Sequence, residues 1–185
     1  MGFALANQMA ENDAKVILIT GPVHLSISHP NITRINIVSA EEMYQSCVNV
    51  FLSCDIAIMC AAVADYRPLN PSPEKIKKTD SEQLVIHLER NKDILAELGS
   101  LKNTHQILGG FSLETHNEEN FALDKLKRKN CDFIVLNSLK DEGAGFGADT
   151  NKVSIYSKGG TIEHFALKSK ENVAKDIVAF IQNNF

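Results

Sequence analysis

Apolar side chains recur along the chain at two different spacings, and these predict helices that alternate with strands. Residues 1–12 (MGFALANQMAEN) carry apolar side chains at helical spacing, whereas residues 15–20 (KVILIT) form a short apolar run that stops at Gly21-Pro22, as buried strands do. The predicted helices cover residues 1–12, 39–54, 93–101, 118–129 and 169–182. The predicted strands cover residues 15–20, 32–38, 55–63, 84–88, 106–111 and 131–136, and a hairpin joins 152–157 to 161–167.

The order of these elements predicts an α/β fold. Strands and helices alternate up to about residue 150, so we expect three layers, with a mostly parallel sheet, helices on both of its faces and a late antiparallel hairpin. The run 55–63 is apolar on both faces, which is typical of a central parallel strand. Ligands of such sheets bind beyond the carboxyl ends of the strands. The polar residues that follow apolar runs are Gly21-Pro22, Asp65, Glu114 and Asn137.

Composition and charge limit the partners and the compartment. The chain has 185 residues, 44% hydrophobic and 23% charged, which suits one globular domain. Its formal net charge of -4 argues against nucleic-acid or membrane affinity, and no apolar run is long enough to span a bilayer. Four cysteines without CxxC spacing are typical of reduced thiols, so we expect a cytoplasmic protein. The six histidines lack metal-ligand spacing, so no protein-caged transition metal is expected.

Asp65 follows the run 55–63 through small residues, Ala61-Ala62-Val63-Ala64. Small side chains would let a planar ligand lie against the backbone, where Asp65 could accept hydrogen bonds. A cap for the following turn explains Asp65 equally well. The residues alone leave both interpretations open.

A loop with three prolines and three lysines follows Asp65. Pro68, Pro71 and Pro73 disfavour helix, and the lysines of KIKK (residues 75–78) end the loop. A mobile, cationic loop would suit a polyphosphate that is enclosed after binding. From the residues alone, however, a solvated basic turn is the favoured interpretation.

The glycine-rich stretch at residues 142–147 (EGAGFG) is interpreted as an irregular loop, because it precedes a strand and lacks the helix N-terminus that binds phosphate. The sequence contains no P-loop, no GxSxG and no strand-GxGxxG-helix unit, so a Rossmann dehydrogenase is not favoured. Pattern alone therefore predicts an α/β enzyme with an anion-binding flap.

Taken together, the motifs resemble one family, the phosphopantothenoylcysteine synthetases (phosphopantothenate-cysteine ligases), whose bacterial members often form the C-terminal half of a bifunctional flavoprotein. AAVADYRP followed by KIKK is the most specific part of the resemblance. The matching stretches run in order through most of the chain: MGFALA, ITGPVHL, SAEEM, AAVADYRP, KIKK, the DIL of NKDIL, GGFSLET, KLKRK, VLN, GFG and Asn151.

The resemblance implies a Rossmann-like fold and an amide-forming ligase in coenzyme A biosynthesis. In the family, the carboxylate of 4'-phosphopantothenate attacks the α-phosphate of CTP to give an acyl-cytidylate and pyrophosphate, and the amine of L-cysteine then displaces CMP. Mg²⁺ accompanies the triphosphate, and its ligands in this chain are not assigned. The resemblance also implies a homodimer, and a flavin-dependent decarboxylase domain fused to it or associated with it.

The resemblance further implies site residues. Lys75 would be the catalytic flap lysine on the triphosphate, and the helix lysines Lys125 and Lys129, at i and i+4, would face the same anion. The CTP site would comprise Met59, Cys60, Ala61, Asp65, Lys75, Asn91, Lys92, Asp93, Ile94, Phe111, Lys125 and Lys129. The phosphopantothenate site would comprise Ala61, Ala62 and Asp65.

Two departures from the family pattern stand beside the resemblance. Family members carry a phosphate-binding ISNxSSGK stretch before the segment that matches MGFALA, so we expect residues 1–185 to be a single ligase domain that lacks this loop. Many members have proline where this chain has Lys92. The alternative function is a nucleotide-binding α/β domain without ligase activity. For the dimer, we expect the hairpin at residues 152–167 to form the interface, because Val153, Ile155, Ile162 and Phe165 need apolar cover.

Overall fold

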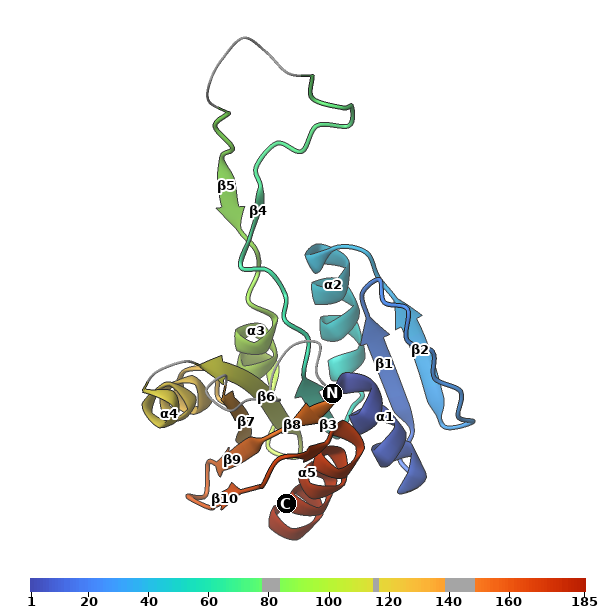
Figure 1. The fold of residues 1–185 in the computed structure, drawn as a ribbon, viewed down its shortest axis with the longest axis vertical. Coiled ribbons are helices and arrows are strands. Elements are labelled where there is room, and N and C mark those ends of the chain that lie inside the picture. Colours follow the sequence, from blue (N-terminus) through green and yellow to red (C-terminus); the bar gives the residue numbers. More distant parts are fainter. Residues whose placement is uncertain (78–83, 115–116, 139–148) are drawn as a thin grey trace.

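The computed structural model describes residues 1–77, 84–114, 117–138 and 149–185, which form the elements labelled in Figure 1. The helices are α1 (Gly2–Glu11), α2 (Ala40–Phe51), α3 (Ile94–Leu101), α4 (Glu118–Arg128) and α5 (Lys170–Asn184). The strands are β1 (Val16–Thr20), β2 (Ile32–Asn36), β3 (Ile56–Met59), β4 (Tyr66–Pro68), β5 (Leu88–Arg90), β6 (Ile107–Glu114), β7 (Phe133–Ser138), β8 (Thr150–Asn151), β9 (Val153–Ser157), β10 (Ile162–His164) and β11 (Lys168–Ser169).

The main sheet has five strands in the order β10-β9-β7-β6-β3. The strands β3, β6 and β7 run parallel, and the late hairpin β9-β10 joins them in antiparallel pairing. This mixed α/β sheet confirms the predicted fold class. Strands β1 and β2 form a separate parallel pair beside it (Figure 1).

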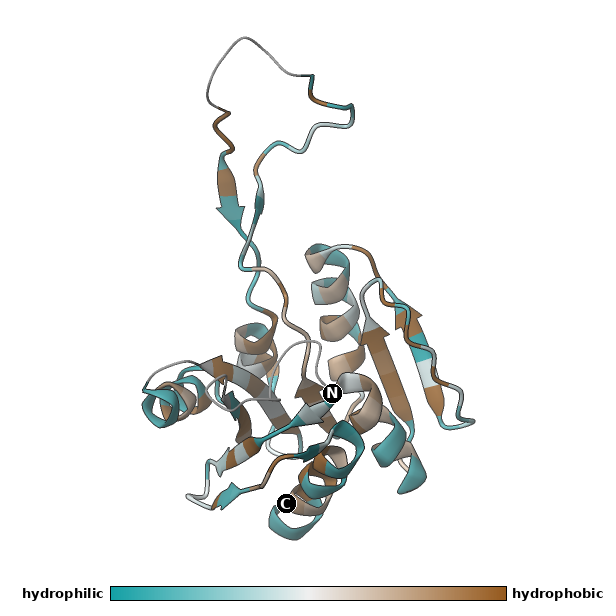
Figure 2. Ribbon diagram, in the orientation of Figure 1, coloured by the Kyte–Doolittle hydropathy of each residue, from teal (hydrophilic) through white to brown (hydrophobic). Residues whose placement is uncertain are grey.

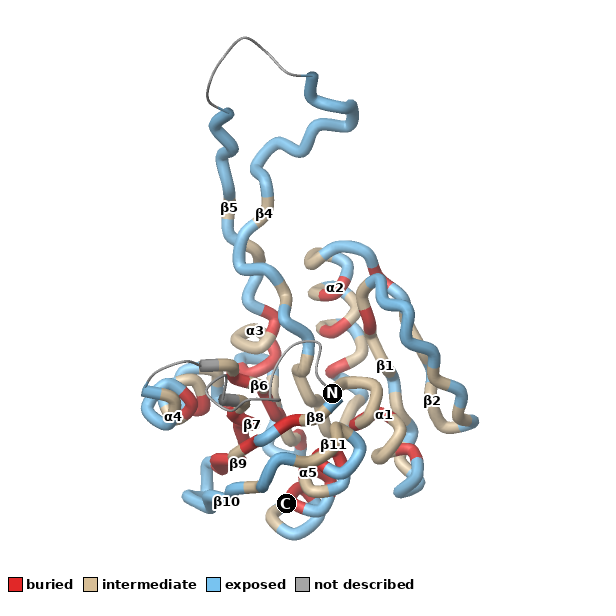
Figure 3. The backbone as a smooth tube through the Cα atoms, in the orientation of Figure 1, coloured by how far each residue is buried: buried red, intermediate tan, exposed pale blue. Residues whose placement is uncertain are grey.

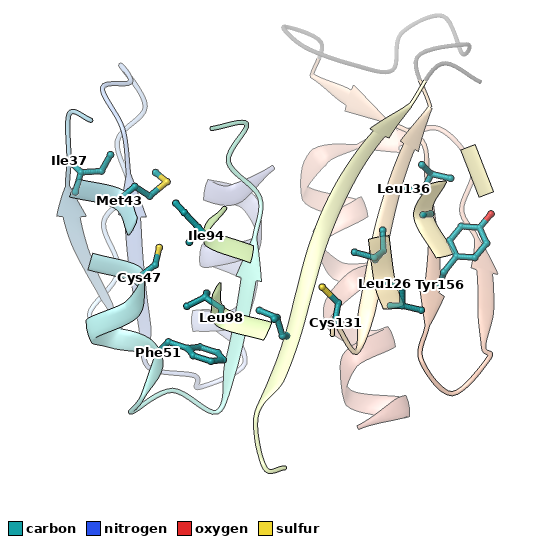
Figure 4. Close-up of a cluster of buried hydrophobic side chains, with 13 residues drawn as sticks. Ile37, Met43, Cys47, Phe51, Ile94, Leu98, Leu126, Cys131, Leu136 and Tyr156 are labelled. Carbon is teal, nitrogen blue, oxygen red and sulfur yellow. The ribbon is translucent and has the colours of Figure 1, made fainter. Parts of the chain in front are cut away.

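Helices cover both faces of the main sheet, as predicted for three layers. On one face, α2, α3 and α4 contribute Met43, Leu98 and Leu126 to a core that also contains Ile134 and Leu136 of β7 (Figure 4). On the other face, α1 and α5 pack against the alternate residues of β7, including the fully buried Phe133. Successive side chains of a strand point to opposite faces, so β7 supplies both cores.

Local signals in the sequence place the helix starts. Ser39 caps α2 by accepting a hydrogen bond from the Glu42 backbone N–H (3.2 Å), and Glu42 reaches back to the Val38 N–H (2.7 Å). Asp93 and Ser169 cap α3 and α5 in the same way. The predicted capping box is confirmed, although its returning bond goes to Val38 in place of the cap residue.

Two strand predictions are wrong in part. The strand predicted over residues 55–63 ends at Met59, and within the described residues β3 pairs only with β6, so it is not central there. The strand predicted over 84–88 is displaced, because β5 covers Leu88–Arg90 and pairs with β4, which lies in the predicted loop. The apolar run 84–86 was wrongly interpreted as part of a strand, because its side chains are exposed.

Residues 66–77 and 84–90 form an arm that projects away from the body of the molecule. The short antiparallel pair β4-β5 makes its base, and residues 69–77 and 84–87 continue it outward (Figures 1 and 3). Parts of the arm are apolar, as the brown segments of Figure 2 show, and several of its large apolar side chains are exposed. They are Tyr66, Leu69, Ile76, Leu84, Val85, Ile86 and Leu88.

Candidate functional site

A cleft of about 1450 Å³ opens between β1 and β3. It is lined by both strands, by parts of α1 and α2, and by the stretch from Met59 to Ala64 that follows β3. Ala61, Ala62 and Ala64 are exposed there, and their small side chains leave the backbone accessible. The structure therefore gathers Met59, Cys60, Ala61 and Ala62 of the predicted site on one wall of the cleft.

Asn91 fastens the end of this wall to the base of the arm. Its side-chain Nδ2 donates to the Ala64 carbonyl oxygen (2.7 Å), and its backbone N–H donates to the Asp65 carbonyl oxygen (2.8 Å). Arg67 donates to the Asn91 Oδ1 (2.8 Å) and to the carboxylate of Glu89 (2.9 Å). These bonds leave the exposed carboxylate of Asp65 at the junction of wall and arm.

Asp93 joins α3 to the end of α4. Its Oδ1 accepts from the Ala96 backbone N–H (2.9 Å), and its Oδ2 accepts from the ammonium of Lys129. Burial raises the pKa of the Asp93 carboxyl, but the hydrogen bonds from Lys129 and Ala96 outweigh it, so the pKa lies below the ordinary value. Asp93 is therefore a carboxylate at neutral pH.

Lys125 lies one helical turn before Lys129 on α4. Its ammonium donates to the Phe111 carbonyl oxygen on β6 (2.7 Å). The ammonium of Lys125 thus meets β6, and that of Lys129 meets the carboxylate that caps α3. Each one already has a protein partner, so an incoming anion would compete with a carbonyl and with a carboxylate.

Lys92 points to α2. Its ammonium donates to the carboxylate of Glu41 (2.6 Å) and lies 4.4 Å from the centroid of the Tyr44 ring. The side chains of both partners of the ion pair are about half exposed. Asn91, Lys92 and Asp93 are consecutive, yet each is fastened to a different part of the protein.

The family of the chain follows from comparison with known proteins. The sequence model of the DNA/pantothenate metabolism flavoprotein C-terminal domain matches residues 1–185. The chain belongs to this family.

Individual relatives of this flavoprotein C-terminal domain family agree. The Coenzyme A biosynthesis bifunctional protein CoaBC of Bacillus subtilis (strain 168) is 43% identical over 178 residues, which cover 96% of this chain and 43% of that protein. A protein named cysteine/cysteine sulfinic acid decarboxylase, from a prokaryote of unknown identity, is 51% identical over 178 residues, covering 96% of this chain and 49% of that protein. The chain thus spans about half the length of the curated relatives it matches.

A solved structure supports the same family. The crystal structure of the C-terminal domain of CoaBC superposes with a TM-score of 0.80 at 35% identity, covering 97% of this chain and 79% of that one. The family resemblance expected from the motifs is confirmed.

The structure does not bring every predicted site residue of this flavoprotein-family domain together. Lys75 is exposed in the outer part of the arm, which projects away from the body of the molecule (Figure 1) and does not line the cleft. Lys77 is exposed on the same stretch, whereas Lys78 and the loop at residues 142–147 lie outside the described residues. The buried Ile94 packs in the core below Asp93.

Sequence reasoning missed Arg67, Glu41 and Tyr44. Arg67 stands inside the quoted motif AAVADYRP, and its pairing with Glu89 follows from the register of β4 and β5, in which the two residues face each other. Glu41 and Tyr44 are three apart on α2, so they share a helix face. Nothing along the chain signals that this face meets Lys92.

The described residues can be compared with the requirements of a metal site and of a membrane-spanning helix. In the described ranges, no three histidine, cysteine, aspartate or glutamate side chains gather as ligands for a metal ion. Among these same residues, no helix combines the length and apolar character needed to cross a membrane.

Proposed function

We propose that this domain is a phosphopantothenate-cysteine ligase that activates 4'-phosphopantothenate with CTP. The observation that carries the proposal is the match to the flavoprotein C-terminal domain family over residues 1–185, with CoaBC relatives at about 40% identity. The proposed reaction belongs to coenzyme A biosynthesis. The names of these relatives place the relatives in that pathway. We propose a cytoplasmic location for the reaction.

The proposed chemistry has two steps. The substrate carboxylate attacks the α-phosphate of CTP, so that a carboxyl–phosphate bond forms and pyrophosphate leaves. The amine of L-cysteine then attacks the activated carbonyl, the amide bond forms and CMP leaves with the electron pair. The first step brings two anions together, so cations and positioning would supply most of the rate enhancement, and no protein nucleophile is needed.

The two parts of the site suit the two substrates. We assign phosphopantothenate to the wall at Ala61 and Ala62, beside Asp65. We assign the cytidine to the segment 91–94 and to Phe111, because this segment is held rigidly against the same wall. The triphosphate would then meet Lys125 and Lys129, whose present partners would be exchanged for phosphate oxygens.

Mg²⁺ fits this arrangement as an ion held mainly by the nucleotide. Magnesium in proteins usually keeps several waters and takes one or two carboxylates together with substrate phosphates. The exposed Asp65 can supply one carboxylate, whereas Asp93 is already paired with Lys129. When bound, Mg²⁺ would neutralise part of the triphosphate charge.

Lys75 keeps its proposed catalytic role under one condition. Because residues 69–77 project outward, the arm must approach an active site, of its own or of a partner protomer, before Lys75 meets the triphosphate. Lys75→Ala should then slow pyrophosphate release about 10²-fold, the loss typical of one charge-stabilising group. Lys77→Ala, on the same stretch, is the matched control and should have a much smaller effect.

The test of the ligase proposal uses CTP and 4'-phosphopantothenate without cysteine, and it follows pyrophosphate. Release of pyrophosphate, followed by CMP when cysteine is added, is the expected result. The alternative is a nucleotide-binding domain without ligase activity; one relative, 49% of which this chain covers, has a name that mentions a decarboxylase and no ligase. Binding of CTP without pyrophosphate release would support that candidate and sink the ligase proposal.

We also propose a homodimer, in which the arm forms the interface. The hairpin at residues 152–167 is the weaker candidate, because Val153 and Ile155 are buried in the core with α5 of the same protomer, although Ile162 is 45% exposed. The arm is different: Leu84, Val85 and Ile86 are 70%, 72% and 61% exposed on the stretch that leads into β5 of an isolated two-stranded ribbon. Such a ribbon is marginal alone and gains apolar cover from a second copy.

Light scattering tests the interface. The unaltered protein should be a dimer, and Leu84→Asp should shift it toward monomer. Leu52→Asp is the matched control, because Leu52 is also 70% exposed but lies at the end of α2 on the body. A monomeric unaltered protein would refute the dimer, and a dimer that survives Leu84→Asp would remove the arm from its interface.

A further inference from the structure

The segment Asn91 to Asp93 is fastened at three separate points. Asn91 is bound to the wall at Ala64 and Asp65, and Asp93 is bound to α3 and to Lys129 of α4. The ligase proposal already places nucleotide on these two residues. The third point of attachment is Lys92, whose ammonium is bound to Glu41 of α2 although Lys92 stands in the expected CTP site.

The α2 side of this contact is built from three residues on one helix face. Glu41 and Tyr44 are at i and i+3, and Gln45 follows at i+4 from Glu41. Gln45 Nε2 donates to the same carboxylate oxygen of Glu41 that accepts from Lys92, at 2.9 Å and 2.6 Å. Two donors therefore hold the Glu41 carboxylate in one orientation while the Tyr44 ring lies beside the ammonium.

The electrostatics agree with this geometry. The hydrogen bond from Lys92, followed by that from Gln45, lowers the pKa of the Glu41 carboxyl below its ordinary value. Glu41 is thus ionised throughout the neutral range. The charge of Lys92 is matched by a carboxylate and by the negative face of an aromatic ring.

We propose that Glu41 and Tyr44 are positioning residues that hold the nucleotide segment 91–93 at a set distance from α2. In this role Lys92 acts as a tether, and its ammonium is directed at α2 in place of a substrate phosphate. Because α2 lines the cleft together with Ala61 and Ala62, the tether joins the nucleotide segment to a second element of the cleft lining. This inference rests on the proposed ligase function for its kinetic consequences, but the tether itself does not.

Kinetics separate a tether from a phosphate ligand. Glu41→Gln keeps Lys92 charged and removes its ion pair to α2, while the contact with the Tyr44 ring remains. If Lys92 is a tether, this variant should raise the KM for CTP about two- to fivefold with kcat within about twofold, the size expected from the loss of an exposed ion pair. If Lys92 binds phosphate, freeing it should leave the KM unchanged or lower it, and that result would overturn the proposal.

Further variants sharpen the test. Lys92→Met and Tyr44→Leu should raise the KM in the same way, Lys92→Arg should largely restore it, and the double variant Glu41→Gln/Lys92→Met should be no worse than either single one. Asp124→Asn is the matched control, since the Asp124–Arg128 pair is an exposed i, i+4 contact on α4 away from this segment. Additive effects in the double variant would contradict a shared contact.

Hydrogen exchange of the ligand-free protein tests the tether independently of turnover. The Asn91 N–H, which donates to the Asp65 carbonyl oxygen, and the Ala96 N–H, which donates to Asp93, report on the order of the segment. Both amides should exchange faster in Glu41→Gln than in the unaltered protein and in Asp124→Asn. If exchange accelerates but the unaltered protein releases no pyrophosphate, the ligase proposal fails and the tether stands. If exchange is unchanged, the tether fails whatever the turnover.

Discussion

Gly99 controls how closely α3 approaches the end of α4. A Cβ atom at this position would lie 1.9 Å from the Lys129 carbonyl oxygen, where real Cβ contacts are 3.0 Å or more, so Gly99→Ala requires the two elements to separate by about 1.1 Å. The obstacle is backbone and cannot rotate away. Asn130, which has a positive φ of 50° and donates from Nδ2 to the Gly99 carbonyl oxygen (2.8 Å), closes the same contact.

The sign of the change in unfolding free energy shows whether the helix propensity of alanine or the close contact with Lys129 dominates. In an exposed helix, alanine in place of glycine stabilises by about 1 kcal/mol. Forcing a tight contact apart costs about 1–3 kcal/mol or more. We therefore expect Gly99→Ala to lower the free energy of unfolding by about 2 kcal/mol, equivalent to a fall in Tm of about 4–8 °C for a chain of this size.

Urea and thermal unfolding measure this change. Ser100→Ala, at the adjacent exposed position of α3, is the control and should stay within about 0.5 kcal/mol of the unaltered protein. Stabilisation by Gly99→Ala would show that α3 and α4 separate freely, and it would refute the close contact. Because the obstacle is the backbone of Lys129, Gly99→Ala should also change the KM for CTP if the ligase proposal holds.

Two further predictions concern titrating groups. The lowered pKa of Asp93 contributes stability that is present above pH 3.8 and is lost as the pH falls through the lowered value. Asp93→Asn should therefore flatten the acid limb of the curve of unfolding free energy against pH, by under about 1 kcal/mol because the side chain is more than half exposed. An acid limb identical to that of the unaltered protein would contradict the ion pair with Lys129. Burial raises the pKa of Cys47 to about 11 and that of Cys131 to about 12. A disulfide reagent at pH 8 should therefore modify both thiols slowly in the native protein and rapidly in urea. For the same reason, the free energy of unfolding should fall as the pH rises above 9. Fast modification of the native protein at these two positions would show that this part of the core opens readily.

The helices and the parallel strands were predictable because their signals are local. Ser39 and Asp93 are cap residues followed by helical spacing, and the bounds of α2 and α3 follow from them. The arm was not predictable in the same way. Its strands are three residues long, β4 ends in Pro68, and the apolar residues near β5 are exposed, so hydrophobic period carries little information there.

The site residues were predicted from the motif resemblance, whereas the contacts that hold segment 91–93 in place were not. The reason is that the partners in these contacts lie far apart along the sequence. Arg67 meets Asn91 across 24 positions, and Lys92 meets Glu41 across 51. A pattern along the chain identifies each element but not which helix face lies beside which loop. Because these contacts join distant parts of the chain, the position of segment 91–93 depends on how the helices and the arm pack around it. A substitution such as Gly99→Ala, which touches no proposed ligand contact, should therefore reach the site through Lys129 and Asp93, while a change at Glu41 should reach it through Lys92.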